Sequence, residues 1–311
     1  MSEQTPSRRG GWSHRGGDPV GPLDRATEVD VPTDGPPIEL HEVFTDDGLY
    51  LPALVRTPPG PGPFPTVVCL HGGSGGLGVR WLVDFATNRG ALFERLLAEG
   101  YAVCVTEGRR ENEGAYGTDP DGVLDHEDVI GVYRYLRRQA FVDRRRIGFF
   151  GASHGGELQL KLAAEVETPP AALTAFEPAG IEFLGLRFDG PRVESNLQFR
   201  DPLDDDQIDL EAAVERIDRI DDDLPILVGG RDDDHLQGLF RKCYELLDRR
   251  GKSVEWVSFD HPEHAYQWGP RRTRGVGDPG DGGSPTYDLG PVEAETIDTA
   301  VGFLNEHVRD R

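Results

Sequence analysis

The feature that most constrains this 311-residue chain is a serine boxed by glycines, Gly151-Ala152-Ser153-His154-Gly155, where an apolar run meets a helical pattern. A strand that turns this sharply into a helix strains the backbone of its central residue and leaves no space for side chains two positions away. Gly151 and Gly155 meet that requirement. Such a turn raises the hydroxyl above a sheet and aims the first helix amides at the same point, so it predicts a nucleophilic Ser153. The alternative is a Gly-rich turn without a catalytic role.

Apolar runs and helical patterns alternate along most of the chain. An antiparallel hairpin is predicted at 38–45 and 49–56, and buried strands at 66–70, 101–105, 146–151, 171–176, 224–228 and 254–259. Helical spacing is found at 90–100, 123–140, 156–166, 210–220, 236–250 and 292–308. This alternation predicts an α/β fold, with a mostly parallel sheet of eight strands and helices on both faces.

The chain length suits one large domain with appended segments. Residues 1–37 are rich in Gly, Pro, Arg and Asp without periodicity and are expected to form a disordered tail. Residues 38–311 are then one domain, in which 178–222 is expected to form a small lid and 269–291 a long loop.

Charge and cysteine usage exclude several classes of protein. There are 56 acidic residues against 33 basic ones, a formal net charge of -23, and only three residues are lysines. A field of one sign this large repels itself unless salt screens it, so we expect a protein from a high-salt cytoplasm. Nucleic acid is not expected as a partner, because phosphate binding needs a basic face. Cys69, Cys104 and Cys243 lie in predicted core elements, and no disulfide framework is expected.

Membrane insertion and export are not expected either. No apolar run approaches the ~20 residues of a membrane helix, and we therefore expect a soluble protein. Arg8-Arg9 is followed by Gly, Ser, His and Asp instead of the apolar stretch of an export signal.

Two further polar clusters follow predicted strands. Asp232 comes after the strand at 224–228, and His264 comes after the strand at 254–259. A serine needs a base to take its proton, and the base needs an anion to orient it. The order Ser153, Asp232, His264 therefore predicts a catalytic triad. Asp233 and Asp234 are alternative acids, and His261 is an alternative base.

A loop without bulky side chains, His71-Gly72-Gly73-Ser74-Gly75-Gly76, follows the strand at 66–70. Its backbone amides can approach a ligand closely at the carboxyl end of the sheet. A phosphate cradle is the competing interpretation, but the loop lacks the lysine and hydroxyl residue of the nucleotide-binding motif. His71 is expected to orient this loop.

These motifs resemble the α/β-hydrolase superfamily, and within it the catalytic domain of the prolyl oligopeptidase and dienelactone hydrolase-like group. The resemblance covers residues 38–309 and rests on His-Gly-Gly at 71–73, Gly-Ala-Ser-His-Gly at 151–155, Gly-Gly-Arg-Asp-Asp at 229–233 and Pro-Glu-His at 262–264. It implies Ser153 as nucleophile, Asp232 as acid and His264 as base, with the amides of Gly73 and His154 as oxyanion donors. Neither a cofactor nor a metal is implied.

The expected activity is hydrolysis of a small carboxylic ester through an acyl-enzyme. Dienelactone hydrolases usually have a cysteine nucleophile, so Ser153 favours another activity within the group. The alternatives are a serine peptidase, whose substrate amine Glu107, Glu111, Glu113 or Glu177 could anchor, and a non-catalytic binding module on the same fold. A metal site formed by His261, His264 and the Asp run is a further alternative, which leaves Ser153 without a role. Tyr116, in the polar loop at 107–119, is expected to contact substrate.

Overall fold

The computed structural model describes residues 25–29, 37–73, 78–88, 90–109, 124–187, 203–232, 235–269 and 287–311. Its strands are β1 (Arg25–Val29), β2 (Ile38–Phe44), β3 (Tyr50–Arg56), β4 (Phe64–Leu70), β5 (Ala102–Thr106), β6 (Val142–Ala152), β7 (Ala172–Phe176), β8 (Ile226–Arg231) and β9 (Val254–Phe259). They form one sheet in the order β1-β2-β3-β5-β4-β6-β7-β8-β9. The strands from β5 to β9 in this order pair in parallel, and β1, β2 and β3 are antiparallel to their neighbours. The predicted fold class is confirmed, with one strand more than expected.

The additional strand is β1, which lies inside the segment expected to be a tail. It pairs antiparallel with β2, and Val29 lies opposite Ile38. Five residues are too few for periodicity to distinguish from the surrounding Pro- and Gly-rich sequence, and only the edge of β2 gives them a partner. The rest of 1–36 lies outside the described residues.

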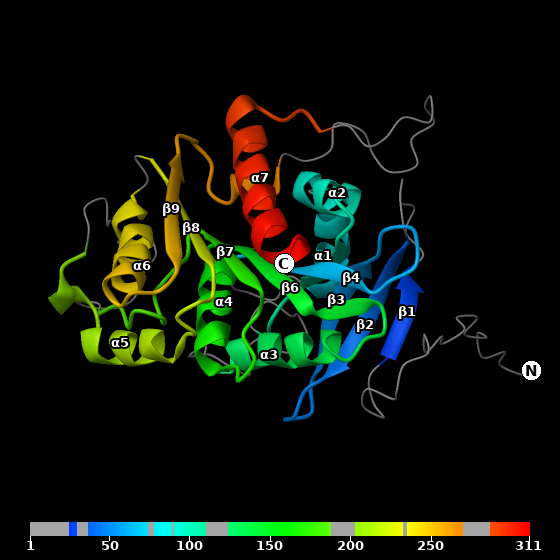
Figure 1. Cartoon of the computed structure of the whole chain (residues 1–311), viewed down its shortest axis with the longest axis horizontal. Coiled ribbons are helices and arrows are strands. Elements are labelled where there is room, and N and C mark those ends of the chain that lie inside the picture. The colour runs from blue at the N-terminus through cyan, green and yellow to red at the C-terminus, as the bar shows by residue number, and fades with distance from the viewer. Residues whose placement is uncertain are drawn as a thin grey trace, which may run out of the picture.

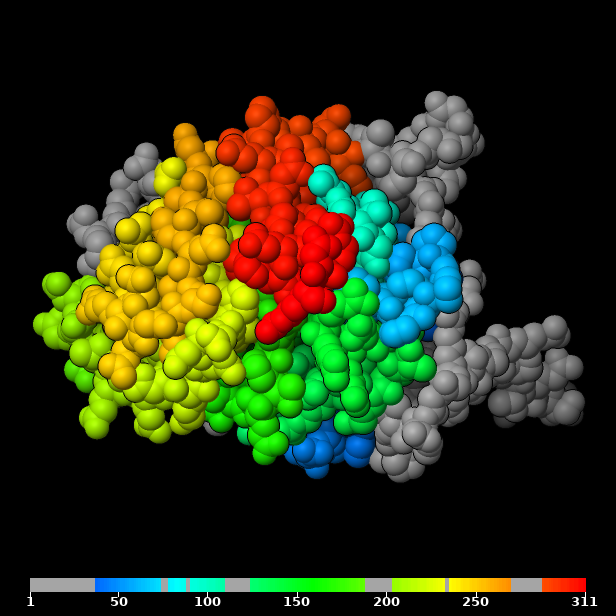
Figure 2. Space-filling model, viewed as in Figure 1, coloured from blue at the N-terminus to red at the C-terminus, as the bar shows by residue number. Residues whose placement is uncertain are grey.

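Helices cover both faces of this sheet (Figure 1). The helices in the described ranges are α1 (Gly78–Asn88), α2 (Ala91–Ala98), α3 (Asp125–Leu136), α4 (His154–Glu165), α5 (Leu210–Arg219), α6 (Gln237–Arg249) and α7 (Pro291–Leu304), with a terminal π-helical turn at Asn305–Arg309. One buried apolar cluster unites α3, α4, α5 and α6, and a second unites α1, α2 and α7. Figure 2 shows α7, in orange and red, packed beside α2, in cyan. None of these helices is both long and apolar enough for a membrane crossing.

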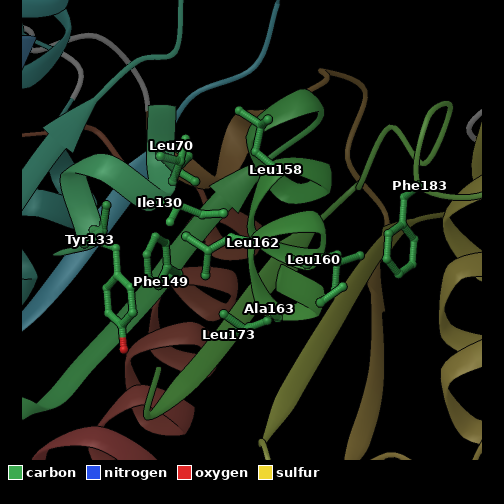
Figure 3. Close-up of a cluster of buried hydrophobic side chains, with 14 of the residues drawn as sticks. Leu70, Ile130, Tyr133, Phe149, Leu158, Leu160, Leu162, Ala163, Leu173 and Phe183 are labelled. Atoms are coloured by element: carbon green, nitrogen blue, oxygen red, sulfur yellow. The ribbon is translucent and has the colours of Figure 1, made fainter. Parts of the chain in front are cut away.

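The core around α4 holds the nucleophile helix in place. Leu158, Leu160 and Leu162 of α4 are at most 1% exposed, and Figure 3 shows them between the sheet and the neighbouring segments. Phe149 of β6 and Tyr133 of α3 pack with their ring centroids 5.7 Å apart. Burying each such side chain contributes roughly 1.5–3 kcal/mol, so α4 has a well-determined position on the sheet.

Part of the segment expected to form a lid belongs to the core of the domain. Within 178–222, α5 is a crossover helix between β7 and β8, and its Ala213 and Ile217 are fully buried in the core cluster of α4 and α6. Residues 181–186 form a turn that ends in a bridge between Leu186 and Ile208. Residues 188–202, like most of the predicted loop at 269–291, lie outside the described residues.

Two local predictions from the loop sequences differ from the structure. Helix α1 follows the Gly-rich loop and was not expected. Arg109 belongs to the polar loop at 107–119, where charged residues are usually solvated, yet it is 3% exposed and its guanidinium donates two hydrogen bonds to the carboxylate of Asp128, of 2.9 and 2.6 Å. A third bond of 2.6 Å joins it to Asp47 of the hairpin turn.

All three cysteines are buried and free, as predicted for core residues. Burial raises the pKa of Cys104 to about 12 and raises the pKa values of the Cys69 and Cys243 thiols as well. These thiols therefore remain protonated and unreactive in the folded chain.

Candidate active site

The predicted strand-to-helix turn is present at Ser153, between β6 and α4. Ser153 has φ 56° and ψ −123°, a conformation that costs a residue with a side chain about 1–3 kcal/mol. The flanking glycines are required by contact distances. A Cβ atom on Gly151 would lie 2.4 Å from the carbonyl oxygen of Gly155, and one on Gly155 would lie 1.9 Å from that of Leu70. The surrounding backbone thus fixes the serine at the carboxyl end of the sheet.

The loop after β4 packs directly against this serine. A Cβ atom on Gly72 would lie 2.6 Å from the Cβ of Ser153 and 3.2 Å from its Oγ. Gly73 has φ +102°, which favours glycine, and it lines the same pocket as Ser153. Gly73 and His154, the first residue of α4, thus line one pocket with Ser153, and their amides remain the predicted oxyanion donors.

His71 has the contacts of a residue that orients this loop. Its Nδ1 is 2.9 Å from the carbonyl oxygen of Gly72, and its Nε2 is 3.3 Å from Oε2 of the buried Glu107. The indole of Trp81, from α1, lies against the ring with centroids 4.5 Å apart. The imidazole is therefore held between the loop, β5 and α1.

The side chain of His154 also has partners other than the serine. Its Nε2 lies 2.5 Å from Oδ2 of Asp125, and its Nδ1 lies 3.6 Å from Oε2 of Glu157. Burial by itself would raise the pKa of Glu157, but the contacts with His154 and with the amide of Phe183 outweigh burial and lower it. Glu157 thus stays ionised and accepts the amides of Glu182 and Phe183, at 2.6 and 2.7 Å, which attaches the turn at 181–186 to α4.

His264 lies in the loop after β9, and its partner is a carboxylate that the triad prediction did not include. The Nδ1 atom of His264 contacts Oε2 of Glu177, the residue that follows β7. Glu177 is completely buried and has φ 45°. Gln267 donates through Nε2 to its other oxygen, and Nε of Arg231 lies 3.3 Å from Oε2. Three polar side chains therefore converge on this one carboxylate.

Asp232, the predicted acid, is not the partner of His264 in the structure. It is exposed, and its Oδ1 accepts a hydrogen bond of 2.5 Å from the hydroxyl of Ser258. Neither Asp232 nor Glu177 is among the described residues that line the pocket, whereas Arg231, which lies against Glu177, does line it. Arg231, the last residue of β8, thus faces Glu177, and the carboxylate in contact with His264 follows β7, the strand next to β6. Asp233 and Asp234 lie outside the described residues.

His261, the alternative base, faces a different carboxylate. Its Nε2 lies 3.2 Å from Oε1 of Glu293, at the start of α7, and its ring stacks on Tyr266 with centroids 4.0 Å apart. Of these two histidines, His264 lines the same pocket as Ser153, and His261 is not among the described residues that line it.

That pocket has a volume of about 570 Å³. Ser153, His264, Gly73 and His154 line it together. Its walls are mainly large apolar side chains from α1, α6, the turn at 181–186 and the loop after His264: Trp81, Phe85, Ile181, Leu236, Leu239, Phe240 and Trp268. Tyr116, the predicted substrate contact, lies outside the described residues.

Comparison with known proteins supports the fold. No protein-family model and no curated protein matches the sequence. Among solved structures, dipeptidyl peptidase 4 of Porphyromonas gingivalis has a TM-score of 0.59 at 17% identity, over 88% of this chain but only 36% of the peptidase. An esterase of Pyrobaculum calidifontis has a TM-score of 0.59 at 16% identity, over 87% of this chain and 85% of the esterase.

A third structure, described as a dienelactone hydrolase of Klebsiella pneumoniae, has a TM-score of 0.52 at 15% identity. It matches over 91% of this chain and 99% of its own. The chain thus has the α/β-hydrolase fold, and the resemblance seen in its motifs is confirmed at the level of the fold.

Proposed function

We propose that this chain is a serine hydrolase that cleaves small carboxylic esters, with Ser153 as nucleophile, His264 as base and Glu177 as the acid that orients the base. The observation that supports this most is the contact of His264 with a buried carboxylate, because His264 also lines the pocket that contains the strained Ser153. A buried anion against Nδ1 fixes the imidazole tautomer and leaves Nε2 to accept a proton. Glu177 replaces the Asp232 of the sequence prediction in this role.

The reaction follows from the positions of these groups. Nε2 of His264 takes the hydroxyl proton of Ser153 as Oγ bonds to the ester carbon, and the amides of Gly73 and His154 stabilise the oxyanion. The imidazolium then gives its proton to the departing alcohol, which leaves an acyl-serine. Water next attacks the acyl carbon while His264 takes its proton, and return of that proton to Oγ releases the carboxylic acid.

The pocket walls favour an ester with apolar groups over a charged peptide. Of the carboxylates expected to anchor a substrate amine, Glu107 contacts His71 and Glu177 contacts His264. Glu182, which lines the pocket, is 2.7 Å from Nζ of Lys161. Glu111 and Glu113 lie outside the described residues.

A serine peptidase is the second candidate, supported by the similarity to dipeptidyl and acylaminoacyl peptidase structures. Rates on p-nitrophenyl acyl esters and on aminoacyl p-nitroanilides separate the two functions. We expect ester cleavage that Ser153→Ala abolishes; faster anilide cleavage would favour the peptidase. No turnover of any ester or anilide, with ligand binding unchanged in Ser153→Ala, would favour a binding module.

A further inference from the structure

Arg231, the last residue of β8, connects the acid of the site to the loop that contains the base. It is 7% exposed. Its Nε lies 3.3 Å from Oε2 of Glu177, and its Nη1 donates to the carbonyls of His261 at 3.2 Å and Pro262 at 2.9 Å. A planar guanidinium has donors in a fixed fork, so one side chain can hold the carboxylate and the two carbonyls at once.

The two carbonyls belong to the loop that leads into the base. His264 is two residues beyond Pro262, and its own contact is with the same Oε2 atom of Glu177 that faces Arg231. Displacing Arg231 would therefore remove a contact from Glu177 and from the loop that contains His264 at the same time. The guanidinium also places a positive charge next to a carboxylate that solvent does not reach.

Resting on the proposed function, we propose that Arg231 is a positioning residue that holds His264 against Glu177 and sets the acid limb of the pH–rate profile. Arg231 lies beside the contact between His264 and Glu177, and a positive charge there opposes the addition of a proton to either residue. Without the charge, the pair would take up its proton at higher pH, and the active deprotonated pair would be lost earlier as the pH falls.

Other charged and titratable groups surround this cluster and remain in place when Arg231 is changed. His71, His154, Glu157, Glu182 and His235 line the same pocket as Arg231 and His264. Asp232 follows Arg231 in the sequence, and His261, in the loop that Arg231 contacts, is joined to Glu263, Tyr266 and Glu293. Burial raises the pKa of Tyr266, which therefore stays neutral in the working range. Asp232 and Glu293 contact Ser258 and His261 respectively, whereas Arg231 is the cation in contact with Glu177.

The test compares two substitutions that separate charge from shape. Arg231→Gln removes the positive charge but keeps an N–H donor. Arg231→Lys keeps the positive charge but loses the planar set of guanidinium donors. The matched control is Arg241→Met on α6, where the arginine lies over Trp256 at 4.9 Å, outside the pocket-lining set. For each protein, kcat and kcat/KM are measured from acid to alkaline pH on the best p-nitrophenyl ester of the wild type, with Tm as a check on folding.

We expect Arg231→Gln to move the acid limb of kcat/KM upward by about one pH unit. Arg231→Lys keeps the wild-type limb while kcat falls roughly tenfold, since a 1 Å misplacement can cost more than that. Arg241→Met matches the wild type. The inference fails if Arg231→Gln slows the reaction without moving the limb, or if Arg231→Lys moves the limb. The second result is decisive even when Arg231→Gln does not fold.

This result is distinct from failure of the proposed function. A wild-type protein that turns over no ester would overturn both proposals. An active wild-type protein with an unmoved limb in Arg231→Gln would overturn only the role of Arg231.

Discussion

Replacing Glu177 by Gln tests the acid assignment most sharply, because the change removes a charge and almost no volume. Glu177 is fully buried, so its field at His264 is weakly screened. The glutamine amide can present an N–H to Nδ1, which stabilises the wrong imidazole tautomer. Asp232→Asn is the matched control, since this exposed carboxylate contacts only a serine hydroxyl among the described residues.

The size of the effect follows from these surroundings. Loss of the acid in comparable triads lowers kcat by roughly 10⁴-fold, equivalent to about 5 kcal/mol of transition-state stabilisation. We expect Glu177→Gln to show a loss of ~10³–10⁴ in kcat, with a residual rate from the oxyanion donors. For Asp232→Asn we expect a change of no more than about threefold, because an exposed ionic group contributes little.

The assay is steady-state hydrolysis of a p-nitrophenyl ester in molar KCl, with unfolding measured on the same samples. Removing one member of a buried ionic cluster can cost roughly 3–5 kcal/mol of stability, so rates are compared only where each variant is folded. A large loss in Asp232→Asn together with a near-normal Glu177→Gln would refute the assignment and restore the acid predicted from sequence.

The remaining predictions concern the proposed base, the strand-to-helix turn at Ser153 and the surface charge. His264→Gln is expected to lose nearly all turnover, and His261→Gln to stay within a few fold in the same ester assay; the reverse result would reassign the base. Gly155→Ala places a Cβ 1.9 Å from the Leu70 carbonyl oxygen, so we expect a loss of at least ~3 kcal/mol in denaturant unfolding. An unfolding midpoint for Gly155→Ala equal to that of the wild type would contradict the close packing described for the strand-to-helix turn. The net charge of -23 predicts a Tm that rises with KCl, because the Debye length falls to ~3 Å at 1 M; a Tm independent of salt would reject salt adaptation.

The few lysines of the chain, whose scarcity is part of the salt prediction, are all paired in the structure. Lys161, Lys242 and Lys252 are all buried, and each lies within 2.7 Å of a carboxylate oxygen. All three lysines of the chain are therefore in ion pairs, and the other basic residues are arginines.

Local backbone rules explain why the strand-to-helix turn at Ser153 could be predicted from sequence. Gly151 and Gly155 are needed wherever a strand turns this sharply into a helix, and a pattern of five residues contains that information. The parallel core of the sheet could be predicted equally well, because β4, β5, β7 and the first half of β8 are short, largely apolar and buried runs between turn signals.

The carboxylate that contacts His264 could not be predicted from sequence in the same way. Both Glu177 and Asp232 follow strands of the parallel sheet, so sequence order admits either one. The choice depends on which strand end faces His264, and that is set by the positive φ of Glu177 and by the side chain of Arg231. The available signal was a buried strand that ends directly in Glu177, on the next strand after the nucleophile.

Arg109 shows the same limit for structural residues. Its partners, Asp128 and Asp47, lie 19 and 62 residues away, and nothing in the local polar sequence distinguishes a buried triple contact from a solvated loop. A charged residue is buried only when tertiary contacts pair it, which local patterns do not encode.

The most direct test of the central claim is covalent labelling of the folded protein by a fluorophosphonate in molar KCl, followed by mass spectrometry of its peptides. The account predicts one modified residue, Ser153, because only an activated serine attacks such a probe rapidly. Labelling is expected to be absent in Ser153→Ala and strongly slowed in His264→Gln and Glu177→Gln. A folded wild-type protein that stays unlabelled, or that is labelled equally well in Ser153→Ala, would contradict a nucleophilic Ser153.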